Sequence, residues 1–198
     1  LYLLLILGGF QGVLGWYMVK SGLVDDPNVS QYRLTAHLGM AVFIYSLILW
    51  TVFDLSLNYN HAIRSRIKWM SSTLTLLIFL MILSGGLVAG TRAGIPFPTW
   101  PLMGDTFIPP QIYSMNPSWL SAFEDMATIQ FNHRMFAYLL TIFIVIFAIV
   151  LLGSNVPRFL KNGTTVLLFV LSLQVILGIS TLLFYIPIPV AAAHQVGA

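Results

Sequence analysis

Three histidines near the heads of long uncharged apolar segments are the residues of this chain best suited to bind a metal. They are His37, His133 and His194, and their equivalent positions predict that all three lie at one depth near one face of a membrane. An ionisable side chain in or near a bilayer interior is costly, so its presence there indicates function. Because neutral imidazole is a usual axial ligand of haem iron, the pattern predicts bound porphyrin iron.

The segments that must position these histidines have the composition of membrane-spanning helices. Of the 198 residues, 58% are hydrophobic and 8% are charged, whereas roughly a quarter of the residues of a soluble domain are charged. Each uncharged run approaches the ~20 residues that cross a bilayer core. The runs occupy residues 1–19, 34–53, 69–90, 135–156 and 162 onward. We expect an all-α polytopic membrane helical bundle with five spanning helices and the start of a sixth near Val190, truncated at both ends.

The charges of the connecting loops predict the orientation of the chain. Two loops hold basic residues and no acidic ones: Arg64, Arg66 and Lys68 in the first, and Arg158 and Lys161 in the second. Short basic loops stay on the cytoplasmic or matrix side of a membrane. The other loops carry Asp25, Asp26, Asp105, Glu124 and Asp125. The histidine-bearing helices therefore start on the outer side, and the net charge of +3 reflects this topology rather than an affinity for nucleic acid. The fourth histidine, His61, falls in a basic inner loop, where we expect it to be solvated.

The 198 residues contain no cysteine. This excludes, within them, covalent haem attachment through a CxxCH motif, thiolate ligation of iron, an iron–sulfur cluster and a disulfide. Any haem must be held non-covalently by imidazole.

A repeated pattern relates two of the histidines. A Gln-x-x-Leu-Gly segment that starts at Gln11 leads to Ala36 and His37, and a second one that starts at Gln174 leads to Ala193 and His194. Such internal similarity indicates a duplication. In the second copy the helix that carries His133 precedes the repeat, so we expect His133 and His194 to form one pair. By symmetry, we expect the partner of His37 to lie upstream of Leu1.

Two arginines are candidate partners of haem propionates. Arg134 follows His133 directly, and Arg92 stands at the outer end of the third apolar run. A guanidinium binds carboxylates in bidentate fashion, but an ordinary interfacial arginine explains Arg134 equally well. Arg92 is the weaker candidate, since it could simply anchor the loop.

The segment between Arg92 and Gln130 is long and rich in proline and aromatic residues. Loops of this length are often functional. Asn116 as N-cap and Pro117 in the first turn predict an amphipathic surface helix that continues to Ala127. A lid over a haem pocket and an interfacial aromatic belt explain this segment equally well.

Six stretches of the sequence resemble the haem A synthase family, in the same order along nearly the whole chain. They are residues 10–23, 32–38, 85–90, 97–101, 132–134 and 193–195. The resemblance implies an eight-helix protein of the bacterial cytoplasmic or mitochondrial inner membrane, built from two similar four-helix halves. It also implies oxidation of the C8 methyl of haem O to a formyl group, which gives haem A for cytochrome c oxidase. The protein would control access and orientation, while the haem supplies the redox chemistry.

The same resemblance implies roles and boundaries. His133 and His194 resemble the axial ligands of a haem b cofactor, and His37 resembles a histidine of the first half, where haem O binds as substrate. Residues 1–68 then form the remainder of the first half without its first two helices, residues 69–198 form the second half, and residues 91–130 form an outer loop with an interfacial helix. Expected partners are haem O synthase, assembly factors of cytochrome c oxidase, an electron donor and the lipid bilayer.

The chain also departs from the family pattern. The first-half acidic residue that precedes the missing histidine by three positions is absent here, and the matching position before His133 is Gln130. The chain resembles the cysteine-free branch of the family. Two other classes of protein remain open from the residues alone: a bis-histidine b-type cytochrome that only passes electrons, and a transporter with interfacial histidines that binds no pigment.

Overall fold

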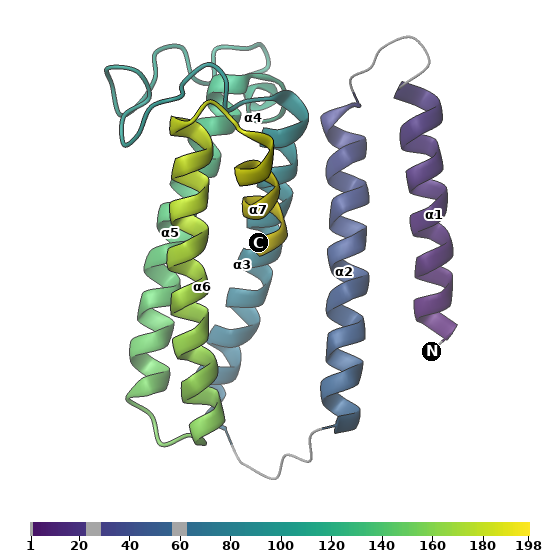
Figure 1. The fold of residues 1–198 in the computed structure, drawn as a ribbon, viewed down its shortest axis with the longest axis vertical. Helices are drawn as coiled ribbons and strands as arrows, with labels where there is room; N and C mark the ends of the chain where they lie inside the picture. Colours follow the sequence, from purple (N-terminus) through teal and green to yellow (C-terminus); the bar gives the residue numbers. More distant parts are fainter. Residues whose placement is uncertain (1, 23–28, 57–62) are drawn as a thin grey trace.

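The computed structural model describes residues 2–22, 29–56 and 63–198, and within them five long helices run side by side (Figure 1). These helices are α1 (Tyr2–Gly22), α2 (Gln31–Ser56), α3 (Ser65–Thr91), α5 (Met126–Leu152) and α6 (Arg158–Leu183). All five are long and apolar enough to cross a membrane. A shorter helix, α7 (Ile188–Gly197), follows α6. The predicted all-helical bundle with five candidate spanning helices is confirmed, and α7 lies where the start of a sixth was predicted. Asp25, Asp26 and His61 lie outside the described residues.

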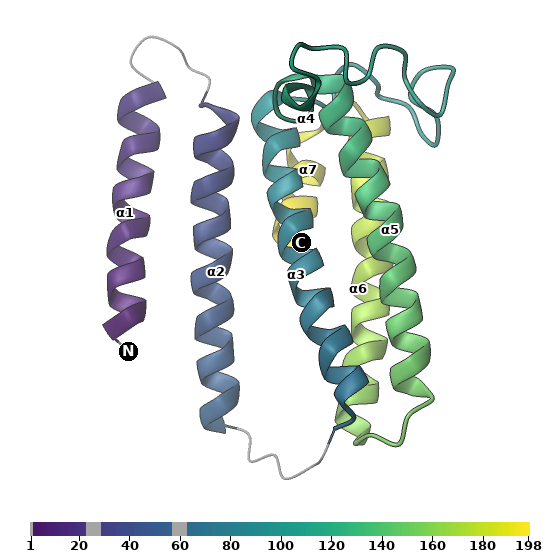
Figure 2. The ribbon, with the colours of Figure 1, turned by 180° about the vertical axis from the view of Figure 1, so that it is seen from behind.

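Each long helix packs mainly against its neighbours in the sequence. Helix α3 contacts α2 on one side and α5 on the other, and α7 folds back beside α6. Figure 2 shows this order from behind, with α1 at one edge of the bundle and α5 and α6 at the other. The chain therefore carries His37 on α2, His133 on α5 and His194 on α7.

The buried core lies between α3, α5 and α6. It consists of Ile67 and Leu74 from α3 together with Leu140, Ile144, Phe147 and Leu151 from α5, and partly buried residues of α6 pack against it. The outward faces of these helices expose many large hydrophobic side chains. A helix that is apolar around its whole circumference suits a lipid environment.

Two glycines let α2 and α3 approach closely near their outer ends. A Cβ added to Gly90 would lie 2.6 Å from the Cα of Gln31, and one added to Gly86 would lie 2.9 Å from Thr35 Oγ1. Small residues at helix contacts are how membrane helices gain close packing. The first of these contacts is with backbone, so α2 cannot sit where it does if residue 90 has a side chain.

The outer segment differs from the predicted amphipathic helix. Only a 3-10 turn, η1 (Ser118–Leu120), and a four-residue helix, α4 (Ser121–Glu124), form there. The chain is extended at Asp125, whose carboxylate accepts a hydrogen bond from the N–H of Thr128 and so caps a new helix. Met126 and Ala127 therefore belong to α5. The expectation of one surface helix from Asn116 to Ala127 is wrong because this cap was not recognised.

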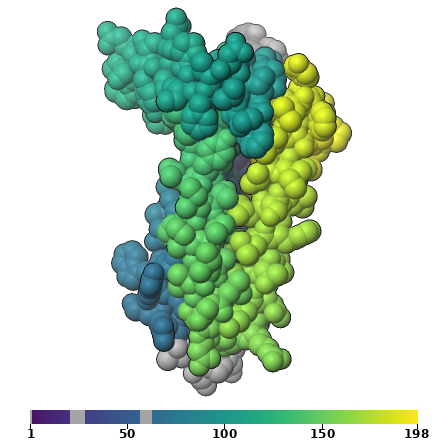
Figure 3. Space-filling view, turned by 90° about the vertical axis from the view of Figure 1, so that its left-hand side faces the viewer, coloured from purple at the N-terminus to yellow at the C-terminus, as the bar shows by residue number. Residues whose placement is uncertain are grey.

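The same cap changes the position of His133. Helix α5 begins at Met126, about two turns before the histidine, whereas the sequence placed the apolar run from residue 135. The outer segment folds over this end of the bundle, and Figure 3 shows an opening between α5 and the C-terminal residues directly beneath it.

Candidate functional site

His194 sits on α7 in a cradle formed by α6. A Cβ added to Gly178 would lie 2.9 Å from the imidazole Cε1 of His194, so the ring packs directly on the bare backbone of that glycine. One turn earlier on the same helix, the side-chain amide of Gln174 donates a hydrogen bond to the backbone carbonyl of His194. The glycine touches the ring and the glutamine holds the backbone that carries it.

His37 sits on α2 in a matching cradle formed by α1. A Cβ added to Gly15 would lie 3.1 Å from the imidazole Cε1 of His37. The amide of Gln11 donates to the backbone carbonyl of His37 at 3.0 Å, and its nitrogen also lies 3.5 Å from the imidazole Nε2. The repeated Gln-x-x-Leu-Gly pattern is thus a repeated three-dimensional arrangement around each histidine.

His133 is held differently, by α3. Ser84 Oγ lies 3.0 Å from the imidazole Nδ1 of His133, within hydrogen-bond distance. A Cβ added to Gly85 would lie 3.6 Å from Cε1 of the ring, an ordinary contact. Because Nδ1 is engaged, Nε2 is the nitrogen left to bind a metal, as is usual for a histidine whose orientation is fixed by a second hydrogen bond.

His133 on α5 and His194 on α7 are both partly buried. Among residues 2–22, 29–56 and 63–198, no group of three or more histidine, cysteine, aspartate or glutamate side chains could hold a bare metal ion. A porphyrin brings four nitrogens of its own and needs only one or two ligands from the protein, so the pair fits haem iron better than a free cation.

His37 belongs to a different part of the bundle. Its ring packs against α1, whereas His133 contacts α3 and His194 contacts α6. The predicted separation into a His133–His194 pair and a distinct His37 is consistent with these contacts, and the ligand roles of all three stay predictions.

Arg134 fastens the outer segment to α5. Its guanidinium donates to three backbone carbonyls, those of Phe97, Thr99 and Leu102, at 2.8 to 3.2 Å. Gln130, one turn earlier, also donates to the carbonyl of Phe97. The Arg134 side chain is 7% exposed, and its Nε is a buried atom without a hydrogen-bond partner among the described residues. A guanidinium has five N–H donors, so a haem propionate could use Nε and the second N–H of Nη1, which these three bonds leave over.

Arg92 forms the C-cap of α3 in a left-handed conformation, with φ of 55°. Its backbone N–H donates to the carbonyl of Ala89, and the next N–H donates to the carbonyl of Val88. Arg92 therefore ends α3 at the point where the outer segment begins, and its role toward a propionate stays a prediction.

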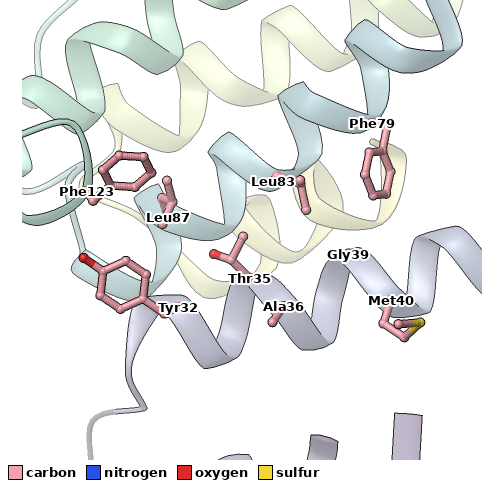
Figure 4. Close-up of a pocket in the computed structure, with 9 residues that line it drawn as sticks. All are labelled: Tyr32, Thr35, Ala36, Gly39, Met40, Phe79, Leu83, Leu87 and Phe123. Atoms are coloured by element: carbon pink, nitrogen blue, oxygen red, sulfur yellow. The ribbon is translucent and has the colours of Figure 1, made fainter. Parts of the chain in front are cut away.

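An apolar cavity of about 470 Å³ lies between α2 and α3, under Phe123 of the outer segment (Figure 4). Thr35 and Tyr32 line one side, and Phe79 and Leu83 line the other. None of the three histidines lines it, because His37 faces α1 from the opposite side of α2. At the outer end, Tyr32 and Gln31 both donate to the carboxylate of Glu124, which ties α2 to the outer segment.

Two functional features were not predicted from the sequence. One is Ser84. The sequence indicated it only by its position before two glycines within an apolar run. The other is the binding of backbone carbonyls of the outer segment by Arg134. Its signal in the sequence was an arginine that follows a long proline-rich segment, because the buried carbonyls of an irregular segment need hydrogen-bond donors.

Comparison with known proteins gives concordant results. The model of the COX15-CtaA family, described as a cytochrome oxidase assembly protein, matches residues 1–198. The chain is 47% identical over 203 residues to a heme A synthase of Nitrosospira multiformis, covering 98% of this chain and 55% of that protein. It is 42% identical over 201 residues to a heme A synthase of Parvibaculum lavamentivorans, covering 100% of this chain and 56% of that protein. It is 40% identical over 199 residues to heme A synthase COX15 of Bos taurus, covering 96% of this chain and 48% of that protein. The chain thus spans about half the length of these relatives.

Proposed function

The chain belongs to the COX15-CtaA family of cytochrome oxidase assembly proteins, and from this premise we propose that it forms part of a haem A synthase. The reaction is the oxidation of the C8 methyl of haem O to a formyl group, which gives haem A for cytochrome c oxidase. The relatives named heme A synthase support this reaction. The repeated cradle around His37 and His194 is the structural observation that carries the proposal, because two similarly held histidines in one membrane protein suit the binding of two haems.

His133 and His194 are the proposed axial ligands of the haem b cofactor. The support is the contact of Ser84 with Nδ1 of His133, which leaves Nε2 for iron, and the packing of the His194 ring on Gly178. When bound, haem b supplies one-electron transfer. The protein holds the two imidazoles, and the bare backbone at Gly178 lets α6 come close to the ring of His194.

His37 is the proposed ligand of the substrate haem O, in a site separate from the haem b site. The support is that Gln11 and Gly15 repeat, around His37, the contacts that Gln174 and Gly178 make around His194. Arg92 and Arg134 are the proposed partners of propionates at the outer surface. The free Nε of Arg134 is the atom that supports its assignment.

The proposed location is the bacterial cytoplasmic membrane or the mitochondrial inner membrane, with both haems toward the outer side. The five spanning helices support a multi-pass membrane protein. The basic residues at the starts of α3 and α6, at the opposite end of the bundle, support the orientation. Proposed partners are haem O synthase, assembly factors of the oxidase and an electron donor.

The decisive experiment is extraction and identification of haem from the purified holoprotein, together with the visible spectrum of three variants. We expect haem b accompanied by haem O or haem A. We expect His133→Ala and His194→Ala to remove or convert the low-spin b-type spectrum, and His37→Ala to abolish haem A formation while it leaves that spectrum in place.

Each alternative gives a different result. Haem b alone in the holoprotein, with no haem O or haem A, identifies an electron-passing b-type cytochrome. Protein without pigment excludes both haem functions. Loss of the haem b spectrum in His37→Ala shows that the two sites are not independent, and unchanged spectra in both His133→Ala and His194→Ala overturn the ligand assignment.

A further inference from the structure

The three histidines differ in what fixes the orientation of the imidazole. A metal-bound histidine normally uses its second ring nitrogen for a hydrogen bond that fixes the ring plane. Ser84 provides this partner for His133. In His37 and His194, however, Nδ1 is a buried atom with no hydrogen-bond partner in the part of the chain that the structure describes. Something other than a bond to Nδ1 must orient these two rings.

The glycine beside each of these two rings leaves no room for a side chain. Real Cβ atoms essentially never come closer than 3.0 Å to a neighbour, and an added Cβ at Gly178 would be 2.9 Å from the ring of His194. The corresponding distance is 3.1 Å for Gly15 and His37, which is also unusually tight. For Gly85 and His133 it is 3.6 Å, an ordinary contact. The tight packing thus occurs at the two rings whose Nδ1 has no partner.

The glutamine one turn before each glycine fixes the backbone of the histidine. Gln174 donates to the carbonyl of His194, and Gln11 donates to the carbonyl of His37. In each pair the glutamine precedes the glycine by four residues, which places both on one face of the helix. This hydrogen bond holds the backbone of the histidine itself. It therefore opposes a rotation of the histidine-bearing helix about its own axis, which would move the imidazole ring.

We propose that Gln174 and Gly178 are positioning residues that set the plane of the His194 imidazole, and that Gln11 and Gly15 do the same for His37. The inference rests on the proposed haem sites. The relative orientation of two axial imidazole planes determines the electron paramagnetic resonance spectrum of low-spin ferric haem, and the surroundings of the ligands tune its reduction potential. The pair on α6 therefore controls the haem b signal, and the pair on α1 does not.

The test compares glycine-to-alanine variants of the holoprotein by electron paramagnetic resonance and by redox titration of haem b. We expect Gly178→Ala to shift the largest g value and the midpoint potential, because the added methyl group must turn or displace the ring of His194. Gly163→Ala is the matched control on the same helix, since no described atom lies within 4 Å of the added Cβ. Gly15→Ala is the matched change at the other cradle. We expect both to leave the haem b signal unchanged.

A milder pair of variants keeps the proposal testable if Gly178→Ala does not accumulate. Gln174→Met retains the length of the side chain and removes the hydrogen bond to His194, and Gln11→Met does the same at His37. We expect Gln174→Met to broaden or shift the largest g value, with haem content retained, and Gln11→Met to leave the haem b signal as it is.

The outcomes separate this inference from the proposed function. A normal haem b signal in both Gly178→Ala and Gln174→Met overturns the positioning role while the haem assignment stands. A shift of the same size in Gly163→Ala or Gly15→Ala overturns it as well, because the effect is then not specific to the cradle. Absence of haem from the unmodified protein overturns the haem site itself and the inference with it.

Discussion

At the scale of the residue, the contact between Ser84 and His133 engages Nδ1 of the imidazole and so leaves Nε2 available to bind a metal. Ser84 Oγ and His133 Nδ1 lie 3.0 Å apart, on different helices. Partners of this kind fix the tautomer and the ring plane of a ligand, and their loss costs about 10- to 100-fold in metal affinity.

We therefore predict that Ser84→Ala weakens haem b binding by about 10-fold or more without removing it. The measurement is haem b per polypeptide after purification, together with the rate of haem transfer to an apoprotein acceptor. Ser71→Ala is the control, because Ser71 lies on the same helix and its hydroxyl donates only to the carbonyl of Ile67. Equal haem retention in both variants would show that Ser84 does not support the ligand.

Residue types and spacing were sufficient to predict the three histidines and the Gln-x-x-Leu-Gly repeat. Both are local patterns: Gln174 and His194 are 20 residues apart, within one helix pair. Ser84 was not predictable because it lies 49 residues from His133, and which face of α3 meets α5 depends on packing among several helices. Near-uniform apolar composition leaves no periodic signal from which that face could be inferred.

At the scale of the element, the outer segment is an irregular chain, and one buried cation holds the turn at its residues 97–102. Arg134 donates to the carbonyls of Phe97, Thr99 and Leu102. Backbone carbonyls without regular secondary structure need such partners when they are buried. Hydrogen bonds to charged groups contribute about 1.5–3 kcal/mol each, so this contact is a main source of order in residues 97–102.

We predict that Arg134→Lys loosens this turn even though it keeps the positive charge. A lysine ammonium lacks the rigid fork of donors that serves several carbonyls at once. The backbone N–H of Met103 donates to Thr106 O, and that of Gly104 donates to Thr99 Oγ1. We expect amide hydrogen exchange at these two positions to accelerate by about 10-fold, equivalent to ~1.4 kcal/mol of local stability. Arg158→Lys, at the exposed start of α6, should leave both rates unchanged. Unaltered exchange in Arg134→Lys would contradict the clamp.

The approach of α2 to α3 gives a second prediction at this scale. An added methyl group at Gly90 would meet the backbone of Gln31 at 2.6 Å, so Gly90→Ala must push the helices apart. We expect a loss of about 1–3 kcal/mol of stability, as for other overpacked contacts. Gly163→Ala should be neutral or stabilising by up to ~1 kcal/mol, because it raises helix propensity in open space. Thermal unfolding in detergent compares the two, and equal midpoints would mean that this contact does not hold α2 in place.

Helix existence was predictable and helix starts were not. Runs of apolar residues predicted all five spans, since a span is a property of composition over a long window. The start of α5 was misplaced because it depends on one carboxylate: Asp125 accepts the N–H of Thr128 and begins the helix within a polar stretch. The residues from Trp119 to Ala127 do not form one helix, because they are divided among η1, α4 and α5, and the extended backbone at Asp125 separates the last two.

At the scale of the whole molecule, charge and architecture both support the proposed orientation. The irregular outer segment lies at one end of the bundle, and the starts of α3 and α6, which carry the basic residues, lie at the other (Figure 1). Lysine and arginine in short loops remain on the cytoplasmic side. The two ends of the bundle thus differ in charge and in chain structure. The three histidines lie on helices α2, α5 and α7, which start at the end that carries the outer segment.

We predict that Ser114→Cys reacts with a membrane-impermeant maleimide added from the outer side of intact cells or mitoplasts, whereas Asn155→Cys reacts only after permeabilisation. Both positions are exposed, one in the outer segment and one in the loop between α5 and α6. Since the chain contains no cysteine, each variant carries one new thiol within it. The reverse labelling pattern would invert the topology and place the haem sites on the cytoplasmic or matrix side.

The cradle around each repeated histidine also bears on how such a protein arises. The residues that orient His37 and His194 come from the helix directly before each one, at separations of 26 and 20 residues. A copied stretch of that length carries a proposed ligand and its proposed support together, so tandem duplication of a gene segment would yield a second half-site without matching mutations elsewhere. His133 depends on a distant helix and lacks this independence. Recombination among relatives should therefore exchange Gln-to-His units intact, while Ser84 and His133 must be inherited as a linked pair.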